Sequence, residues 1–191
     1  MQDVLSFILS VVLLLAMPGP TNTLLAASAA SVGFRRSLRL LPAELGGYMI
    51  AITLYRTAAA PLVAGWPAAA PLLKLLAAAY LIGSSVGLVR RGVAAGHFTT
   101  APMTRVFVTT LLNPKALILA LAIFPQSGAA RASMLFVLTC AAIGSGWLLI
   151  GHSIRAHGQA LATPARVVWV TAIAQAGFAI LISGSALAAM R

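Results

Sequence analysis

The chain has 191 residues, of which 61% are hydrophobic and only 8% are charged, whereas about 25% of the residues in an ordinary soluble domain are charged. A water-soluble fold of this length cannot bury so much apolar surface, so the composition predicts an integral membrane protein. The net charge of +11 comes from basic residues scattered between apolar runs, which excludes a basic face for nucleic acid, and two acidic residues with three histidines are too few to predict a metal site.

Apolar runs long enough to span a bilayer follow one another along the chain. They cover about residues 4–31, 40–61, 72–89, 103–124, 132–151 and 167–189. We therefore expect an all-α, multi-pass fold of six transmembrane helices, in one domain of residues 1–191. The start, Met1-Gln2-Asp3, lacks the basic region of a secretory signal, so the first run is expected to be retained as a helix.

The first run is interrupted at residues 17–22, which read Met-Pro-Gly-Pro-Thr-Asn. Proline lacks an amide donor and clashes with the preceding turn, so the helix should break at Pro18 and Gly19. A half-helix can then start at Pro20, with Thr21 or Asn22 near its first turn. The free amides and the positive dipole end of such a helix suit a carboxylate.

Glu44, in the second run, is the only acidic side chain inside an expected span. A carboxylate there is costly unless it is paired or hydrated. Two interpretations remain open: it carries a proton or binds a substrate ammonium group, or it forms a salt bridge with Arg36 or Arg39. As a hypothesis, Glu44 is assigned to proton coupling at a cytoplasmic gate.

Small residues cluster at 83–87 (Gly-Ser-Ser-Val-Gly) and 144–146 (Gly-Ser-Gly), where they predict close helix packing. The second cluster with His152 could suggest an intramembrane serine hydrolase, but His152 lies about two turns beyond Ser145, at the interface. We therefore expect no enzyme, no catalytic residue and no cofactor. The single cysteine, Cys140, has no partner for a disulfide and is expected to pack in the interior.

The fourth run repeats the interruption at Asn113-Pro114-Lys115. Asn113 is a plausible helix cap and Pro114 a first helical residue, while Lys115 near the bilayer centre costs on the order of 3 kcal/mol unless it faces a polar cavity or a partner. One such break is more often an ordinary kink, but the matched pair favours a binding site. The expected substrate-binding residues are Pro18, Gly19, Pro20, Thr21, Asn22, Asn113, Pro114 and Lys115.

Basic residues alternate between the connectors of the runs. The first, third and fifth connectors and their flanks hold Arg35, Arg36, Arg39, Arg90, Arg91, Arg105, Arg155 and Arg166, whereas the even connectors hold Arg131. This bias predicts cytoplasmic odd connectors and both termini outside, with Arg56 and Lys74 snorkelling near outer helix ends. Residues 1–95 and 100–191 then form two three-helix halves of opposite orientation, a 3+3 inverted repeat with broken first and fourth helices.

Several segments together resemble the lysine exporter (LysE/RhtB) family over essentially the whole chain. They are 17–25 (Met-Pro-Gly-Pro-Thr-Asn-Thr-Leu-Leu), 33–38 (Gly-Phe-Arg-Arg-Ser-Leu), 72–81 in the third run, 111–116 (Leu-Leu-Asn-Pro-Lys-Ala) and 123–126 (Ile-Phe-Pro-Gln). The resemblance implies an exporter of amino acids or related small zwitterions in the bacterial cytoplasmic (inner) membrane, working by proton antiport. It leaves the amino acid and a possible homodimer open.

The alternative to a transporter is a membrane assembly or scaffold protein that uses its glycine faces for packing. The paired breaks separate the two, because a scaffold has no need for two broken helices and a lysine at one depth, whereas a carrier needs polar groups there. An ATP-driven pump is not expected, because the sequence has no P-loop pattern.

Overall fold

The computed structural model describes residues 4–66, 68–95, 101–125, 127–156 and 164–190, and within them it contains helices but no strand. The first half comprises α1 (Val4–Ala16), α2 (Pro20–Val32), α3 (Phe34–Ser37), η1 (Leu38–Leu40), α4 (Leu41–Leu54), the π-helical segment η2 (Tyr55–Ala59), α5 (Ala60–Gly65) and α6 (Ala69–Ala95). The second half comprises α7 (Met103–Leu111), α8 (Pro114–Ile118), the π-helical segment η3 (Leu119–Ile123), α9 (Ala129–Ala156) and α10 (Pro164–Ala188). The all-α prediction is confirmed for these residues.

Three described helices are long and apolar enough to cross a membrane, over Ala69–Gly87, Ala129–Ala156 and Trp169–Ala188. The bent pairs α1–α2 and α7–α8/η3 raise this to five when each pair counts as one span. These helices are consistent with a multi-pass membrane protein. The second expected span does not qualify, because η2 divides it into α-helices of 14 and 6 residues.

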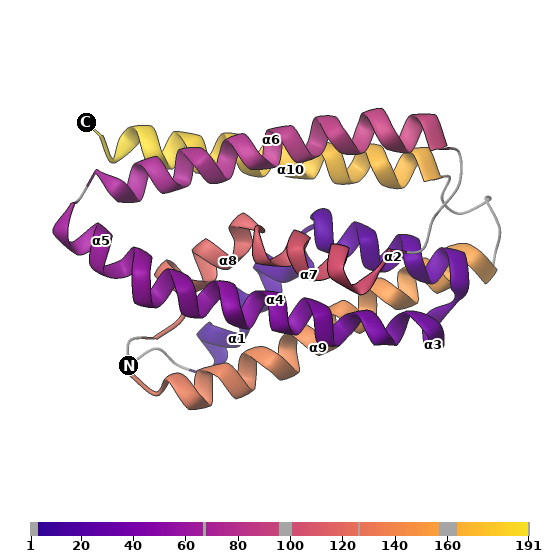
Figure 1. Cartoon of the computed structure of the whole chain (residues 1–191), viewed down its shortest axis with the longest axis horizontal. Helices are drawn as coiled ribbons and strands as arrows, with labels where there is room; N and C mark the ends of the chain where they lie inside the picture. Colours follow the sequence, from indigo (N-terminus) through magenta and orange to yellow (C-terminus); the bar gives the residue numbers. More distant parts are fainter. Residues whose placement is uncertain (1–3, 67, 96–100, 126, 157–163, 191) are drawn as a thin grey trace.

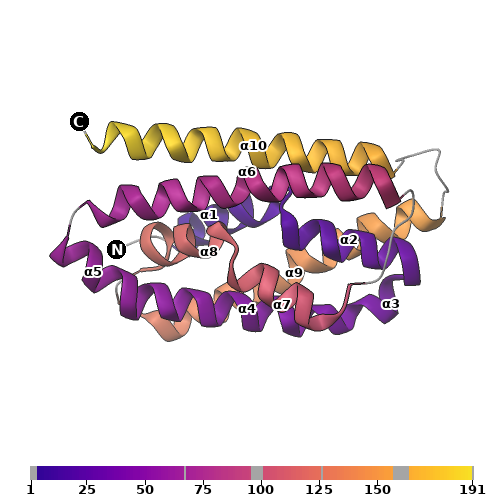
Figure 2. The same ribbon diagram turned by 45° about the horizontal axis from the view of Figure 1, so that its top comes forward.

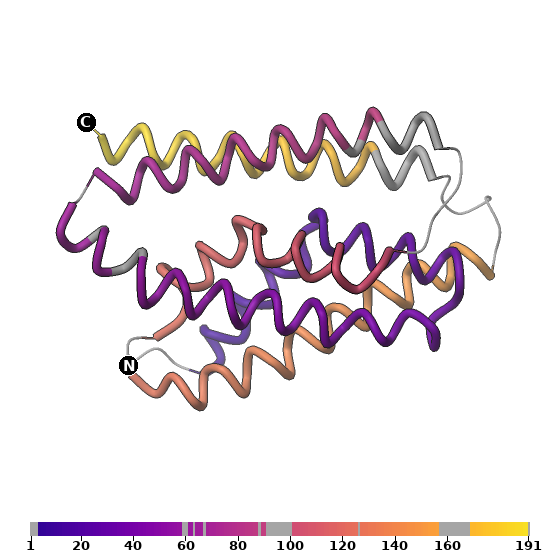
Figure 3. The backbone as a smooth tube through the Cα atoms, viewed as in Figure 1, coloured from indigo at the N-terminus to yellow at the C-terminus, as the bar shows by residue number. Residues whose placement is uncertain are grey.

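Both expected helix breaks are confirmed. The axes of α1 and α2 differ by 64°, and those of α7 and the α8/η3 segment by 45°, and the backbone changes direction at each break (Figure 3). Successive helical runs cross the molecule in alternating directions (Figure 1).

The helices form two groups, which we call the α6/α10 pair and the body. α6 and α10 lie side by side along their length, above a body in which α2 packs on α9 and α4 on α7 (Figures 1 and 2). At one end of the molecule lie α3, the end of α6, the start of α7 and the end of α9; α1 begins and α10 ends at the other (Figure 1). The described arginines that flank the odd connectors, among them Arg35, Arg105 and Arg155, therefore lie at one end.

Apolar side chains cover the outside as well as the core. On α1, Leu5, Leu9 and Leu13 are 59%, 50% and 71% exposed along one face, while Phe7 and Val11 on the other face are buried. On α10 the side chains of Ile173, Ile180 and Leu181 are likewise exposed. An outer surface of this kind is unfavourable in water and suits lipid.

An aromatic core joins α1, α4, η3 and α9. Phe7 meets Phe124 edge-on with ring centroids 5.5 Å apart, and Tyr48 meets Phe136 in the same way at 5.8 Å. Because these rings come from both halves of the chain, the two halves share this hydrophobic cluster.

Glycines allow the closest helix contacts in the body. A Cβ atom at Gly151 of α9 would lie 2.1 Å from the carbonyl oxygen of Ala26 in α2, and one at Gly47 would lie 2.8 Å from Cβ of Thr110. Close packing is confirmed at Gly144, but it is wrong for Gly83, Gly87 and Gly146, where an added Cβ would meet nothing within 4 Å. Gly83 and Gly87 instead line a cavity between α6 and the neighbouring helices.

Arg56, which was expected to snorkel near the outer end of its helix, makes contacts with the fourth helical run that the sequence did not predict. Its guanidinium donates hydrogen bonds to the carbonyl oxygens of Ala120 (3.4 Å), Phe124 (3.2 Å) and Pro125 (3.0 Å), and it lies over the Phe124 ring. A helix end leaves carbonyl groups without helical partners, and Arg56 supplies donors to those at the end of η3. The side chain thereby ties the second helical run to the fourth.

Candidate polar site at the paired helix breaks

The two breaks have the local structure that the sequence predicts. α2 begins at Pro20 after Gly19, whose backbone is extended and provides no side-chain cap. α8 begins at Pro114, and the Asn113 side chain caps it by accepting a hydrogen bond of 3.1 Å from the Lys115 amide. The predictions of Asn113 as cap and Pro114 as first helical residue are therefore confirmed.

Lys115 and Asn22 both bind the carbonyl groups that the first break exposes. The Lys115 ammonium donates to the carbonyl oxygen of Met17, and Nδ2 of Asn22 donates to the carbonyl oxygens of Leu15 (2.8 Å) and Met17 (2.9 Å). Both side chains are buried, with 3% exposed. Gly19 makes room for this contact, because a Cβ there would lie 3.2 Å from the Lys115 nitrogen.

A chain of hydroxyl and amide groups connects the two breaks on the side of α4 and α7. Thr110 donates to the carbonyl oxygen of Val106 at 2.8 Å, so the Thr21 hydroxyl, 3.1 Å from the Thr110 hydroxyl, is the donor in that pair. Asn113 Nδ2 lies 3.3 Å from the Thr21 hydroxyl and 3.3 Å from the Tyr48 hydroxyl, and can donate to both. The network ties α2, α4, α7 and α8 together at buried positions.

Glu44 lies next to this network in the interior. It is 2% exposed, its Oε2 atom has no hydrogen-bond partner, and a Cβ at Gly144 would lie 2.6 Å from that atom. Arg36 and Arg39 are exposed, and neither donates to Oε2. The opposite charge that acts on Glu44 is that of Lys115.

The structure thus brings the predicted residues together from α1–α2, α4 and α7–α8. It also shows that the polar side chains of Thr21, Asn22, Asn113 and Lys115 are engaged with other protein groups. Sequence reasoning missed Tyr48 and Thr110, whose only signal was a polar group within an apolar run. That signal is shared by many residues that merely bond to their own helix, such as Thr139.

Comparisons with protein-family models, with curated proteins and with solved structures give no match for this chain. Membership of the lysine exporter family therefore stays a prediction from the sequence.

Proposed function

We propose that the protein is a secondary transporter that exports amino acids or related small zwitterions across the bacterial cytoplasmic membrane by proton antiport. The observation that carries the proposal is the meeting of two interrupted helices, with the buried Lys115 of one bound to the Met17 carbonyl at the break of the other. Transporters commonly place discontinuous helices near the bilayer midplane, where their ends bind substrate and coupling ions.

In this proposal the helical runs form six spans arranged as a 3+3 inverted repeat. The alternating direction of the runs and the equivalent positions of α1–α2 and α7–α8 support the repeat (Figure 1). The run Leu41–Gly65 is the second span despite its π-helical segment, a local widening that is frequent at functional sites. The arginine-rich end faces the cytoplasm.

The buried polar groups have different roles in the proposed transport cycle. Lys115, Asn22 and Asn113 hold the breaks in place, so that the free amides at the start of α2 stay available to a substrate carboxylate. Glu44 exchanges the coupling proton, since it is the only acidic residue in the described helices and its Oε2 atom is unpartnered. The charge of Lys115 acts on Glu44, which couples the proton to the breaks.

Transport can be tested with purified protein in liposomes loaded with radiolabelled amino acids. An imposed pH gradient should drive amino-acid efflux that is absent from loaded liposomes without protein. The Glu44→Gln variant should fold as the wild type does, but the pH gradient should no longer accelerate its efflux. Arg131→Gln is a matched control, because Arg131 is exposed and distant from the breaks in the structure. If the wild type shows no gradient-driven flux of any amino acid, the scaffold alternative holds instead.

A further inference from the structure

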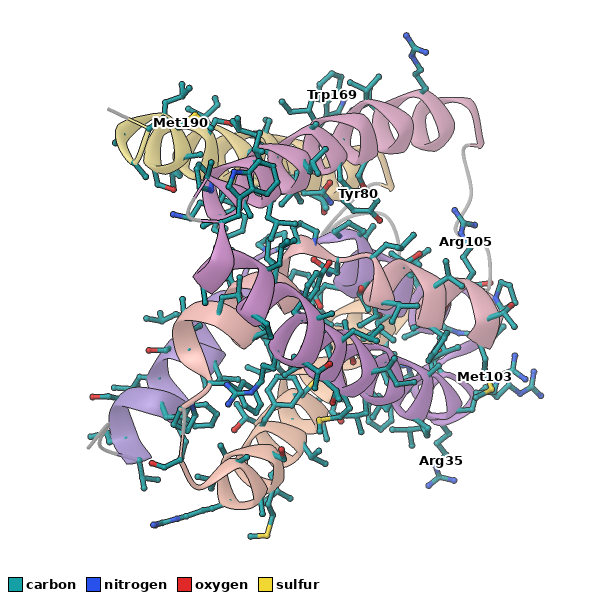
Figure 4. The ribbon with its side chains drawn as sticks, turned by 60° about the vertical axis from the view of Figure 1, so that its left-hand side comes forward. Arg35, Tyr80, Met103, Arg105, Trp169 and Met190 are labelled. Atoms are coloured by element: carbon teal, nitrogen blue, oxygen red, sulfur yellow. The ribbon has the colours of Figure 1, made fainter. Side chains whose placement is uncertain are left out.

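A second polar region lies outside the buried network, between the α6/α10 pair and the body. It is a cavity of about 280 Å³ bounded by α2, α6, α7 and α10. Its polar or helix-terminal lining residues are Pro20, Thr23, Tyr80, Ser84, Arg105, Thr109 and Gln175. Tyr80 points from α6 toward the body, and Arg105 rises from α7 toward the pair (Figure 4). The volume fits a small metabolite.

Gln175 of α10 is the group in this lining that lacks a partner. It is 1% exposed, and its oxygen is 3.4 Å from the Ser85 hydroxyl, but its Nε2 atom has no hydrogen-bond partner. A buried amide donor without an acceptor is costly, and native structures retain few of them. A ligand that supplies an oxygen acceptor would remove this cost.

The charge of the cavity also favours an acceptor-bearing ligand. Arg105 is the one formally charged residue in the described lining, which contains no carboxylate. The start of α2 contributes Pro20, so the positive end of a 13-residue helix faces the same space. Arg105, the helix end and the Gln175 amide all suit a carboxylate, whereas a ligand with net positive charge meets no compensating group.

A cluster of apolar residues lies beside the cavity, one residue along α6 from Tyr80. Ala78 and Leu81 of α6 pack with Ala179 of α10, and Ile118 and Phe178 pack against them. Beyond this apolar cluster lies a separate cavity of about 630 Å³ that includes Lys74 and Arg56 in its lining. The apolar cluster lies between the two cavities, since Ile118 lines the larger one and Leu81 is next to Tyr80 of the smaller one.

From these contacts we infer that the cavity bounded by Pro20, Tyr80, Arg105 and Gln175 is the ligand chamber, which takes a small carboxylate without net positive charge through the Gln175 amide and Arg105. This inference rests on the proposed transport function, and it identifies where the substrate is held and which amino acids are admitted. The apolar cluster at Leu81 and Ile118 is the barrier that the ligand must pass.

Gly83 provides a direct test of the chamber. It lines the cavity, and an added Cβ there would meet nothing within 4 Å, so a larger side chain at this position has room to enter the cavity. Gly177 of α10 is equally open but lies outside the lining, which makes Gly177→Leu a matched control. Binding of radiolabelled L-leucine to detergent-purified protein should fall at least tenfold in Gly83→Leu and less than twofold in Gly177→Leu.

Gln175→Leu tests recognition of the carboxylate. Removing one hydrogen-bond donor to a charged group should weaken L-leucine binding on the order of tenfold, with unchanged elution as a monodisperse protein. Radiolabelled L-lysine should bind the wild type at least tenfold more weakly than L-leucine does. Equal binding of lysine and leucine, or wild-type binding in Gly83→Leu or Gln175→Leu, overturns the inference.

The two proposals fail in different ways. Gradient-driven efflux from liposomes that is equal in the wild type and Gly83→Leu overturns the chamber and leaves transport standing. Binding of L-leucine that Gly83→Leu abolishes, without any gradient-driven efflux, supports the chamber and overturns transport. Absence of L-leucine binding to the wild type overturns the chamber.

Discussion

Single residues differ in what the fold demands of them even when they are of one type. In α9, Gly151 lies against the backbone of α2, whereas a Cβ at Gly146 would meet nothing within 4 Å. Polar residues differ in the same way, because Lys115 binds a carbonyl group while Glu44 keeps an unpartnered oxygen. The effect of a substitution therefore depends on the neighbours that the side chain meets.

The glycine contrast predicts opposite outcomes for one chemical change. Gly151→Ala places a Cβ 2.1 Å from the Ala26 carbonyl oxygen, so α2 and α9 must move apart, at a cost of about 1–3 kcal/mol. Gly146→Ala meets no atom and should be neutral or stabilising by up to about 1 kcal/mol through helix propensity. Thermal unfolding in detergent measures both. Equal melting temperatures of the two variants would show that α9 does not pack on α2 in this way.

Lys115 and Glu44 should be coupled in their effect on stability. Lys115→Met removes the donor to the Met17 carbonyl and the charge that acts on Glu44, and loss of a hydrogen bond made by a charged group costs about 1.5–3 kcal/mol. The double variant Lys115→Met, Glu44→Gln should lose less than the sum of the single variants, because it leaves no unpaired charge. A double-mutant cycle of unfolding midpoints gives the coupling, and strict additivity would contradict it.

At the scale of the helices, the two breaks are stabilised in different ways. Two residues separate the end of α7 from the start of α8. One of them, Asn113, both caps α8 and donates from its side-chain amide to the hydroxyls of Thr21 and Tyr48. The α1–α2 junction lacks a side-chain cap and is held by Asn22 from the first turn of α2 and by Lys115 from α8. The first break therefore depends partly on a tertiary contact, whereas the second has its own side-chain cap.

Two substitutions of Asn113 should separate these roles. Asn113→Asp keeps the acceptor for the Lys115 amide but cannot donate to the Thr21 or Tyr48 hydroxyls. Asn113→Ala loses the cap as well, and should therefore be less stable than Asn113→Asp by about 1 kcal/mol. Chemical denaturation followed by circular dichroism compares them. The reverse order of stability would show that the cap contributes less than the burial of a charged carboxylate costs.

Across the whole molecule, the positions of the basic residues predict how the protein is oriented in the membrane. α3 and the ends of α6 and α9 lie at one end, and α1 begins and α10 ends at the other (Figure 1). Arg35 and Arg131 are both exposed, and they belong to the first and the fourth connector. Since cytoplasmic loops carry the excess of basic residues, the end with Arg35 is expected to face the cytoplasm.

The orientation can be measured with single cysteines, since the native Cys140 is buried. In a Cys140→Ser background, a membrane-impermeant maleimide should label Arg131→Cys in intact cells and Arg35→Cys only after lysis. A C-terminal tag should be accessible from outside in the same cells. Labelling of Arg35→Cys before lysis would reverse the predicted topology.

The sequence by itself determined the features that depend on local chemistry. Proline inside a helical run removes an amide donor and clashes with the preceding turn, so the breaks at Pro18–Pro20 and at Pro114, and the Asn113 cap, could be predicted. The apolar content likewise predicts a helical protein in lipid, because hydrocarbon leaves few other ways to satisfy the backbone. The division of the second run at Tyr55–Ala59 was not predicted, since Arg56 reaches carbonyl groups of η3 that are distant in sequence.

Only the tertiary structure decided how the polar groups are used. Lys115 and Asn22 were expected to face a substrate. The bend between α1 and α2 instead places carbonyl groups within reach of both side chains, and both donate hydrogen bonds to the Met17 carbonyl. Gln175 could not be singled out in the sequence, because its unpaired amide is apparent only once α10 packs on α6 beside α2 and α7. Partners of a buried donor come from elements far apart in the chain, and their distances are fixed only by packing.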